Sequence, residues 1–167
     1  MTYLRSFVLT AGLVLAGAAL AQTTPFSSFE QDGSQPIEIE AESLTLNQAD
    51  GTAIFAGGVT AVQGTLTMSA DMMTVTYAEE TETQAAGIER LVAAGNVFFS
   101  TPTETAEGQE ADYLINEGLL TLTGGVVLTQ GPNALSSREM KIDLTAGTGE
   151  FIGGVRTIIV PQSTETQ

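Results

Sequence analysis

Two ten-residue segments of this chain are half identical although they lie 67 residues apart. FAGGVTAVQG occupies residues 55–64 and LTGGVVLTQG occupies residues 122–131, and five of the ten positions match. A repeat of this kind indicates that one supersecondary unit is used more than once and is stacked on its neighbours. The fold is therefore restricted to architectures made of similar adjoining units.

A looser form of the unit occurs four times, as a segment centred on an acidic residue and followed by a glycine-containing segment and valine. The acidic residues and the glycines that follow them are Glu42 and Gly57, Asp71 and Gly95, Asp112 and Gly124, and Glu139 and Gly153. The separations are 15, 24, 12 and 14 residues, and the second unit carries an insertion around Glu80 to Gly87. This recurrence predicts a sheet of stacked strand-turn-strand rungs.

The glycine pairs of the repeat are typical of turns. Gly-Gly and Gly-Asn supply the positive φ angles that tight turns require. We therefore predict that the chain doubles back at these glycines. The strands between them are then short, about five to seven residues each.

Apolar and polar residues alternate through most of the chain after residue 36. A period of two is typical of half-buried strands, and the abundance of Thr, Val and Ile agrees with it. No segment shows the period of an amphipathic helix, so we predict an all-β chain with almost no helix. The residues predicted to point inward are Ile37, Ile39, Leu44, Leu46, Phe55, Val59, Met68, Val75, Leu91, Phe99, Tyr113, Ile115, Leu122, Val126, Ile142 and Ile159.

The first residues, MTYLRSFVLTAGLVLAGAALAQ, have the pattern of a secretory signal peptide. Arg5 precedes an apolar run from Phe7 to Leu20, and Ala19 to Ala21 form a small-residue cleavage site. The run is shorter than the roughly 20 residues that a spanning helix needs. We predict export and cleavage after Ala21. The remaining organisation is predicted as a flexible segment at 22–35, one β domain at 36–161 and a flexible tail at 162–167.

Composition excludes several functions. The chain has 20 acidic and five basic residues and a net charge of −15, so it repels nucleic acid and anionic membranes. It contains no His and no Cys, which excludes Ser-His-Asp and Cys-His catalysis and imidazole or thiolate metal sites. A carboxylate pair would still suffice for glycoside hydrolysis, but no acidic residue lies in a distinctive motif. We predict a non-enzymatic protein without cofactor or metal.

The ordered segments of the chain resemble the OstA-like domain family of periplasmic lipopolysaccharide-transport proteins. The segments that carry the resemblance are PIEIEAESLTL, GTAIFAGGVTAVQGTLTMSADMMTVTY, IERLVAAGNVFFS and ADYLINEGLLTLTGGVVLTQG, and it covers residues 36 to about 161. The resemblance implies an antiparallel, incompletely closed β-jelly roll whose apolar interior carries lipid acyl chains. Family positions that match Ile37, Ile39, Phe99, Tyr113 and Ile115 are those expected to touch lipid.

The full lipid-binding groove implied by combining the alternation with the resemblance is larger. Its residues are Ile37, Ile39, Leu44, Leu46, Phe55, Val59, Met68, Val75, Leu91, Phe99, Tyr113, Ile115 and Leu122. The resemblance also implies partners: lipopolysaccharide, an LptC-like inner-membrane protein, an LptD-like outer-membrane protein and further copies of the chain stacked head to tail. The expected joint lies between Ile37–Leu46 and Arg156–Val160.

The residues alone leave two alternatives open. Without the resemblance, the residues favour inward side chains that fill a closed sandwich core. The repeat is also compatible with a structural β-solenoid or filament that binds no lipid. If lipid does bind, the scarcity of Lys and Arg predicts that the headgroup stays in solvent while the acyl chains are enclosed.

Overall fold

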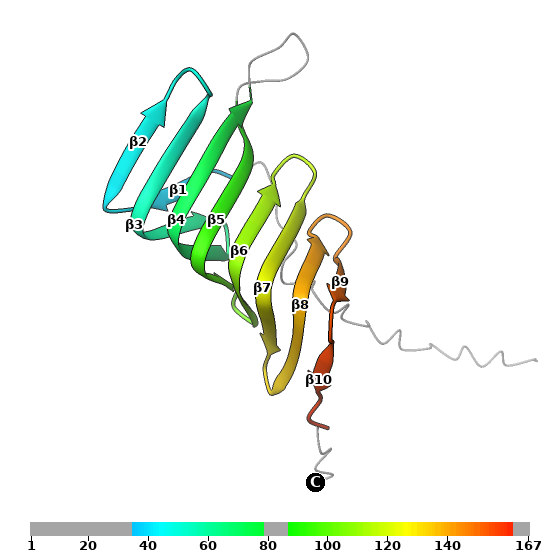
Figure 1. The fold of residues 1–167 in the computed structure, drawn as a ribbon. Coiled ribbons are helices and arrows are strands. Elements are labelled where there is room, and N and C mark those ends of the chain that lie inside the picture. Colours follow the sequence, from blue (N-terminus) through cyan, green and yellow to red (C-terminus); the bar gives the residue numbers. More distant parts are fainter. Residues whose placement is uncertain (1–34, 79–86, 162–167) are drawn as a thin grey trace, which may run out of the picture.

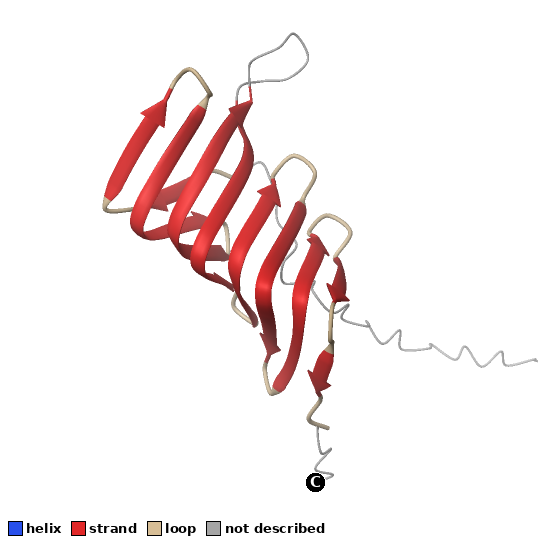
Figure 2. Ribbon diagram, viewed as in Figure 1, coloured by secondary structure: helices blue, strands red, loops and turns tan. Residues whose placement is uncertain are grey.

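The computed structural model describes residues 35–78 and 87–161. In these residues the chain forms ten β-strands and no helix (Figures 1 and 2). The predicted signal peptide, all but the last residue of the segment 22–35, and the tail at 162–167 lie outside the described residues. Within the described ranges, no helix is long and apolar enough to cross a membrane.

All ten strands belong to one antiparallel sheet, ordered β1-β3-β4-β5-β6-β7-β8-β10, with β2 also beside β3 and β9 also beside β8. The strands are β1 (Ile37–Glu40), β2 (Ser43–Asn47), β3 (Thr52–Gln63), β4 (Leu66–Ala78), β5 (Gly87–Ser100), β6 (Glu104–Leu114), β7 (Leu119–Gln130), β8 (Asn133–Asp143), β9 (Thr148–Ile152) and β10 (Arg156–Ile158). Because β1 and β2 share one partner strand, and β9 and β10 another, each pair is one interrupted strand. The two end strands do not pair with each other, so the sheet is not closed.

Three of the four glycine pairs lie within strands, and the fourth, Gly153 and Gly154, interrupts the strand between β9 and β10, which both pair with β8. The prediction that these glycines form hairpin turns is therefore wrong. In β3 the register with β4 shifts between Ala56 and Val59, on either side of Gly57 and Gly58. Equivalent shifts occur around Gly95 in β5 and around Gly124 in β7. Extra residues on one strand form a β-bulge, which bends the strand instead of ending it.

The predicted strand length is wrong for the same reason. From β3 to β8 the strands are 11 to 14 residues long, not five to seven. Two segments predicted as separate short strands are therefore the two arms of one bent strand. The chain reverses instead at turns that contain Gly64, Gly118 and Gly131, each with a positive φ angle.

Each bulge is covered by a side chain of the neighbouring strand. A Cβ atom on Gly57 would lie 2.8 Å from Cβ of Glu42, and the φ angle of Gly57 is +87°, so both packing and backbone conformation favour glycine there. The residues that cover the four bulge glycines are Glu42 on Gly57, Asp71 on Gly95, Gln109 on Gly124, and Arg138 on Gly153. We call this line of bulges and covering side chains the spine. Glu42 and Asp71 are acidic residues of the sequence repeat, whereas Gln109 and Arg138, and not the repeat's Asp112 and Glu139, cover the other two glycines.

The bend at the spine folds the sheet into two half-sheets that face each other. In Figure 1, β1 turns away from β2 and passes behind the long strands. The first half-sheet comprises residues 43–56, 72–78, 87–94, 110–114, 119–123, 139–143 and 148–152, and the second comprises 37–40, 59–63, 66–70, 97–108, 126–137 and 156–158. Buried apolar residues of both halves form one cluster, so the core lies between them.

Candidate functional site

The core consists of rows of apolar side chains that run across the strands. Residues directly opposite in antiparallel strands lie on the same face of a sheet. In the first half-sheet one row is Leu44, Phe55, Met73, Ala93, Ala111, Leu122, Met140 and Phe151. The next is Leu46, Ala53, Val75, Leu91, Tyr113, Leu120, Ile142 and Gly149.

The second half-sheet presents a matching row from its own side. It consists of Ile39, Ala61, Met68, Phe99, Ala106, Leu128, Leu135 and Thr157. Only the last member of this row is polar. The interior is therefore one apolar strip that extends from the first strand of the sheet to the last.

Most residues predicted for the groove are in this interior. Val59, Met68, Val75, Leu91, Phe99, Tyr113, Ile115 and Leu122 are buried, as are Val126 and Ile142 of the wider inward set. Ile37, Ile39 and Phe55 are partly buried and pack against the core.

Three residues of the inward set are exposed. Leu44 and Leu46 belong to the interior rows, yet 52% and 66% of their surfaces are exposed, because no strand of the described residues lies beyond β2. Ile159 follows β10 and is 72% exposed. The predicted direction of Leu44 and Leu46 is thus right, whereas their expected burial is wrong.

Sequence reasoning omitted several interior residues. Met73, Leu120 and Met140 are buried members of the rows but were not in the predicted set. Each lies two residues before a predicted inward residue, so extending the alternation by one step identifies them.

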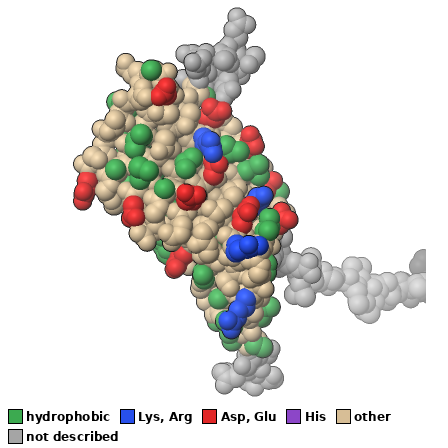
Figure 3. Space-filling view, viewed as in Figure 1, with side chains coloured by type: hydrophobic (Ala, Val, Ile, Leu, Met, Phe, Trp, Pro, Cys, Tyr) green, Lys and Arg blue, Asp and Glu red, His purple; other side chains and the backbone are tan. Residues whose placement is uncertain are grey.

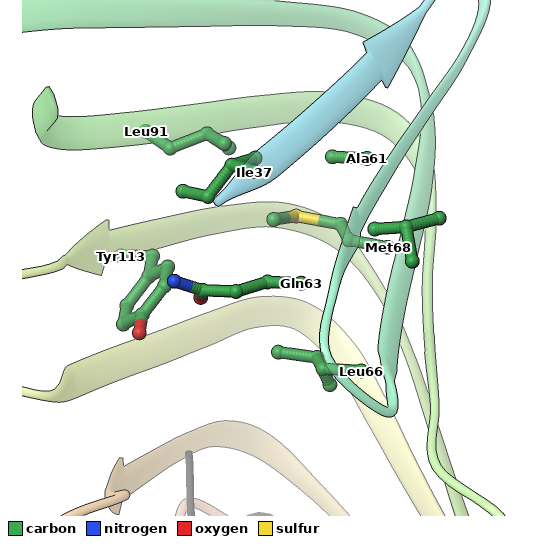
Figure 4. Close-up of a pocket in the computed structure, with 8 residues that line it drawn as sticks. Ile37, Ala61, Gln63, Leu66, Met68, Leu91 and Tyr113 are labelled. Carbon is green, nitrogen blue, oxygen red and sulfur yellow. The ribbon is translucent and has the colours of Figure 1, made fainter. Parts of the chain in front are cut away.

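The middle of the interior is filled by side chains. The two half-sheets meet around a cavity of about 10 Å³, whose lining includes Ile37, Gln63, Leu66 and Leu91 (Figure 4). This volume is at the lower limit for a single water molecule. An acyl chain therefore enters the middle only if the half-sheets move apart.

The two ends of the interior are open. At the β1–β2 end, a pocket of about 320 Å³ is lined by Ile39, Ala41, Glu42, Ser43, Leu44 and Phe55. At the β9–β10 end, a pocket of about 460 Å³ is lined by Leu128, Leu135, Phe151, Ile159 and neighbouring polar residues. Both pockets are continuous with the interior rows, so the apolar strip has an accessible mouth at each end.

Polar groups occur on the interior side of the second half-sheet. Gln63 is only 4% exposed; its Nε2 donates a hydrogen bond to the Gln35 carbonyl at 3.1 Å, and its Oε1 has no partner among the described residues. Its amide points toward the ring of Tyr113, whose pKa is raised by burial (Figure 4). Glu104 is also buried and accepts a hydrogen bond from Nε2 of Gln130 at 2.5 Å. A buried acceptor without a partner destabilises the closed arrangement around it.

Glu104 is the only buried charged residue among the described residues, and acidic and basic side chains are scattered over the face of the molecule shown in Figure 3. Arg90 and Asp112 form a two-hydrogen-bond ion pair with N–O distances of 2.7 and 2.6 Å, which raises the pKa of the guanidinium. No group of three or more metal-ligating side chains occurs within residues 35–78 and 87–161. The interior of the described residues is predominantly apolar, with Gln63, Glu104 and Ser137 as its buried polar residues.

Comparisons with known proteins agree with this geometry. A family model described as LptA/(LptD N-terminal domain) LPS transport protein matches residues 38–148. An uncharacterized protein of Rhizobium meliloti (strain 1021) is 31% identical over 162 residues, which cover 92% of this chain and 87% of that protein. The lipopolysaccharide export system protein LptA of Escherichia coli (strain K12) is 25% identical over 162 residues, covering 92% of this chain and 86% of that protein.

A solved structure confirms the fold. The crystal structure of LptH, the LptA homologous periplasmic component of the lipopolysaccharide transport device from Pseudomonas aeruginosa, superimposes with a TM-score of 0.69 at 17% sequence identity. The match covers 78% of this chain and 99% of LptH. The predicted all-β, antiparallel and incompletely closed β-jelly roll is therefore confirmed.

Proposed function

The chain belongs to the family of LptA and LptD N-terminal-domain lipopolysaccharide transport proteins, and we propose that it carries lipopolysaccharide between the inner and outer membranes with the acyl chains enclosed in its apolar interior. The observation that supports this proposal most directly is the apolar strip, which extends through the whole sheet and is open at both ends. A family of transport proteins also fits a chain whose interior is predominantly apolar.

The free energy of acyl-chain transfer explains why an enclosed path is needed. Burial of apolar carbon stabilises by roughly 0.8 kcal/mol per CH₂ group, so an acyl chain of about 14 carbons gains on the order of 10 kcal/mol by leaving water. A lipid with several chains has several times this barrier to free diffusion. An interior that continues from one molecule to the next removes the barrier.

Lipid entry requires the filled middle of the roll to open. The half-sheets are covalently continuous at the spine, so we infer that they separate at the opposite side, where the strand turns lie. Gln63 and Tyr113 are at the contact between the half-sheets, and the unpartnered Oε1 of Gln63 weakens the closed state there. In the open state, contacts between the side chains of the two half-sheets are replaced by contacts with the acyl chains.

The proposed setting is the periplasm. Residues 1–21 are proposed to direct export and to be removed after Ala21, which agrees with the description of LptH as a periplasmic component. The proposed partners are an LptC-like protein at the inner membrane, an LptD-like protein at the outer membrane, and further copies joined head to tail. An open roll with unpaired strands at both ends suits such a bridge.

Photo-crosslinking at two adjacent phenylalanines tests lipid enclosure. Phe99 is fully buried in the interior, whereas Phe98 is next to it on β5 and faces the opposite side of the sheet. A photoreactive phenylalanine analogue at position 99 should crosslink to lipopolysaccharide, and the same analogue at 98 should not. Equal yields at both positions contradict enclosure, and the absence of lipid adducts from both in a self-associating protein favours a purely structural filament.

A further inference from the structure

A further row of interior side chains lies next to the turns of the second half-sheet. Its members are each two residues from the row that contains Ile39 and Phe99, so they are on the same face of their strands. They succeed one another across the strands as Ile37, Gln63, Leu66, Thr101, Glu104, Gln130 and Asn133. Unlike the rows deeper in the roll, this row is mostly polar.

Glu104 is the charged member of this row, and it is only 3% exposed. Its carboxylate accepts a hydrogen bond from Nε2 of Gln130, and its backbone N–H donates to Oγ1 of Thr101 at 3.1 Å. Burial of a polar side chain is unfavourable unless it is hydrogen-bonded, whereas the next inward residue of β6, Ala106, is apolar and fully buried. Packing of the core alone therefore favours an apolar residue at position 104, and the carboxylate indicates a binding role.

Glu104 lines the pocket at the β9–β10 end, together with Gln130 and Asn133. The apolar residues of the same pocket are Leu128, Leu135, Phe151 and Ile159. Its volume of about 460 Å³ is within the range of roughly 300 to 1,000 Å³ that is typical of ligand sites, which are mostly apolar with a few placed polar groups. The pocket is therefore suited to an apolar chain that carries a polar group.

The hydrogen-bonding character of the polar residues specifies that group. A carboxylate has about four acceptor positions, so Glu104 has the capacity to accept a ligand donor in addition to Gln130. The N–H of Val160 donates to Oδ1 of Asn133 at 3.0 Å, which identifies Nδ2 of Asn133 as the donor end of this amide. A hydroxyl or an amide combines a donor with an acceptor and matches both residues, whereas an ester offers acceptors only.

We propose that Glu104, Gln130 and Asn133 form a polar subsite for a hydroxyl or amide group near the polar end of an acyl chain whose apolar part lies in the β9–β10 pocket. Glu104 accepts a hydrogen bond from the O–H or N–H of the ligand, and Asn133 donates to the oxygen of the same group. This inference rests on the proposed lipid carriage and deepens it, because it names the chemistry by which the interior distinguishes one acyl chain from another.

The same row contains a second buried acceptor, Gln63, near its β1 end. Gln63 is only 4% exposed, and its Oε1 has no partner among the described residues (Figure 4). Next to the turns of the first half-sheet, by contrast, Ile115 and Leu144 are apolar and buried. Donor groups of a lipid are therefore expected against the second half-sheet, where Gln63 and Glu104 offer acceptors at two places along the interior.

Three uncharged probes with the same chain length test the subsite. Methyl β-hydroxylaurate carries a hydroxyl, N-methyl lauramide carries an amide N–H, and methyl laurate carries no donor. Their affinities for the protein are measured by displacement of an environment-sensitive dye. We expect the hydroxyl probe, the amide probe or both to bind about tenfold more tightly than methyl laurate, and the comparison between the two shows which group the subsite selects.

The matched variants are Glu104→Leu and Glu107→Leu. Glu107 is on the same strand but is exposed and faces the opposite side of the sheet. Glu104→Leu should reduce the preference for the donor probe to less than about twofold without weakening the binding of methyl laurate, and Glu107→Leu should keep the full preference. In the unaltered protein, the side-chain amide NMR signals of Gln130 and Asn133 should shift with the preferred donor probe and not with methyl laurate, which gives a readout that does not depend on how a variant folds.

Equal affinities for the three probes, no binding of any probe, unmoved signals of Gln130 and Asn133, or a preference that persists in Glu104→Leu would each overturn the subsite. Lipid carriage is tested separately by crosslinking of lipopolysaccharide at position 99. Crosslinking at this position with equal probe affinities overturns the subsite alone. A donor preference without any crosslinking at position 99 supports the subsite and contradicts the proposed carriage of lipopolysaccharide.

Discussion

Two adjacent glycines in β7 allow the packing of the spine to be measured separately from backbone strain. Gly124 and Gly125 have nearly equal φ angles, +90° and +87°, so alanine is strained at both. A Cβ atom on Gly125 has no heavy atom within 4 Å, whereas one on Gly124 would lie 2.8 Å from Cγ of Gln109. The pair therefore differs mainly in whether the new methyl group meets the covering side chain.

The expected losses in the free energy of unfolding follow from this difference. A positive φ angle costs a residue with a side chain roughly 1 to 2 kcal/mol, and both variants have this cost. Overpacking adds typically 1 to 3 kcal/mol, and only Gly124→Ala has it. We expect the free energy of unfolding to fall by about 1 to 2 kcal/mol in Gly125→Ala and by about 2 to 5 kcal/mol in Gly124→Ala.

Urea denaturation of both alanine variants measures these losses in unfolding free energy. A third variant, Gln109→Gly, tests whether removal of the covering side chain restores stability to Gly124→Ala. Removal of the Gln109 side chain eliminates the overlap, so the double variant Gln109→Gly, Gly124→Ala should lose less than the sum of the single losses. Equal losses in the two alanine variants, or additive losses in the double variant, would refute the view that the covering side chains select glycine in the spine.

Three further predictions concern the interior. Replacement of Gln63 by Leu removes the unpartnered Oε1 and also the hydrogen bond from Nε2 to the carbonyl of Gln35. Because Gln35 is exposed, water replaces that bond, and the unfolding free energy measured by urea denaturation should rise by up to about 1 kcal/mol. Lipid uptake measured by stopped-flow fluorescence should slow, whereas a loss of stability would show that the amide is satisfied in solution. Because burial raises the pKa of Tyr113, the folded state keeps its hydroxyl neutral longer than the unfolded state does. The contribution of this shift to the free energy of unfolding is fully present below the pKa of tyrosine in the unfolded chain, about 10, and is lost as pH rises through the pKa in the folded state. The Tyr113→Phe variant should therefore lose less stability at alkaline pH, as measured by denaturation at a series of pH values. Lipopolysaccharide affinity should change little between about 0.05 and 0.5 M NaCl, and a steep fall that is abolished by Arg138→Ala together with Lys141→Ala would instead indicate headgroup recognition.

The alternation of the sequence predicted the interior well because a period of two determines which face of a strand each side chain occupies. It predicted burial less well because burial also depends on where the sheet ends. Leu44 and Val75 have the same local pattern, yet Val75 has strands on both sides and Leu44 has a strand on only one. The alternation of residues along a strand does not show whether that strand lies inside the sheet or at its edge.

The glycine pairs were misassigned because a positive φ angle is required both in a tight turn and in a bulge. What distinguishes the two is the neighbouring strand, which is not apparent from the glycines alone. The acidic residues of the sequence repeat coincide with only two of the covering side chains, Glu42 and Asp71. Glu42 and Arg138 have opposite charges but the same role, since each places its side-chain carbons over a glycine.

The sequential strand order also determines how the length of this molecule can change in evolution. Gly95, Gly124 and Gly153 succeed one another at intervals of 29 residues, and each interval contributes two strands. Insertion of one more such interval would lengthen the roll by about 10 Å, because neighbouring strands are about 4.8 Å apart. Neither end strand would change, so longer and shorter descendants would keep the same binding surfaces, and duplication of a short stretch of gene is enough to alter the reach of the protein.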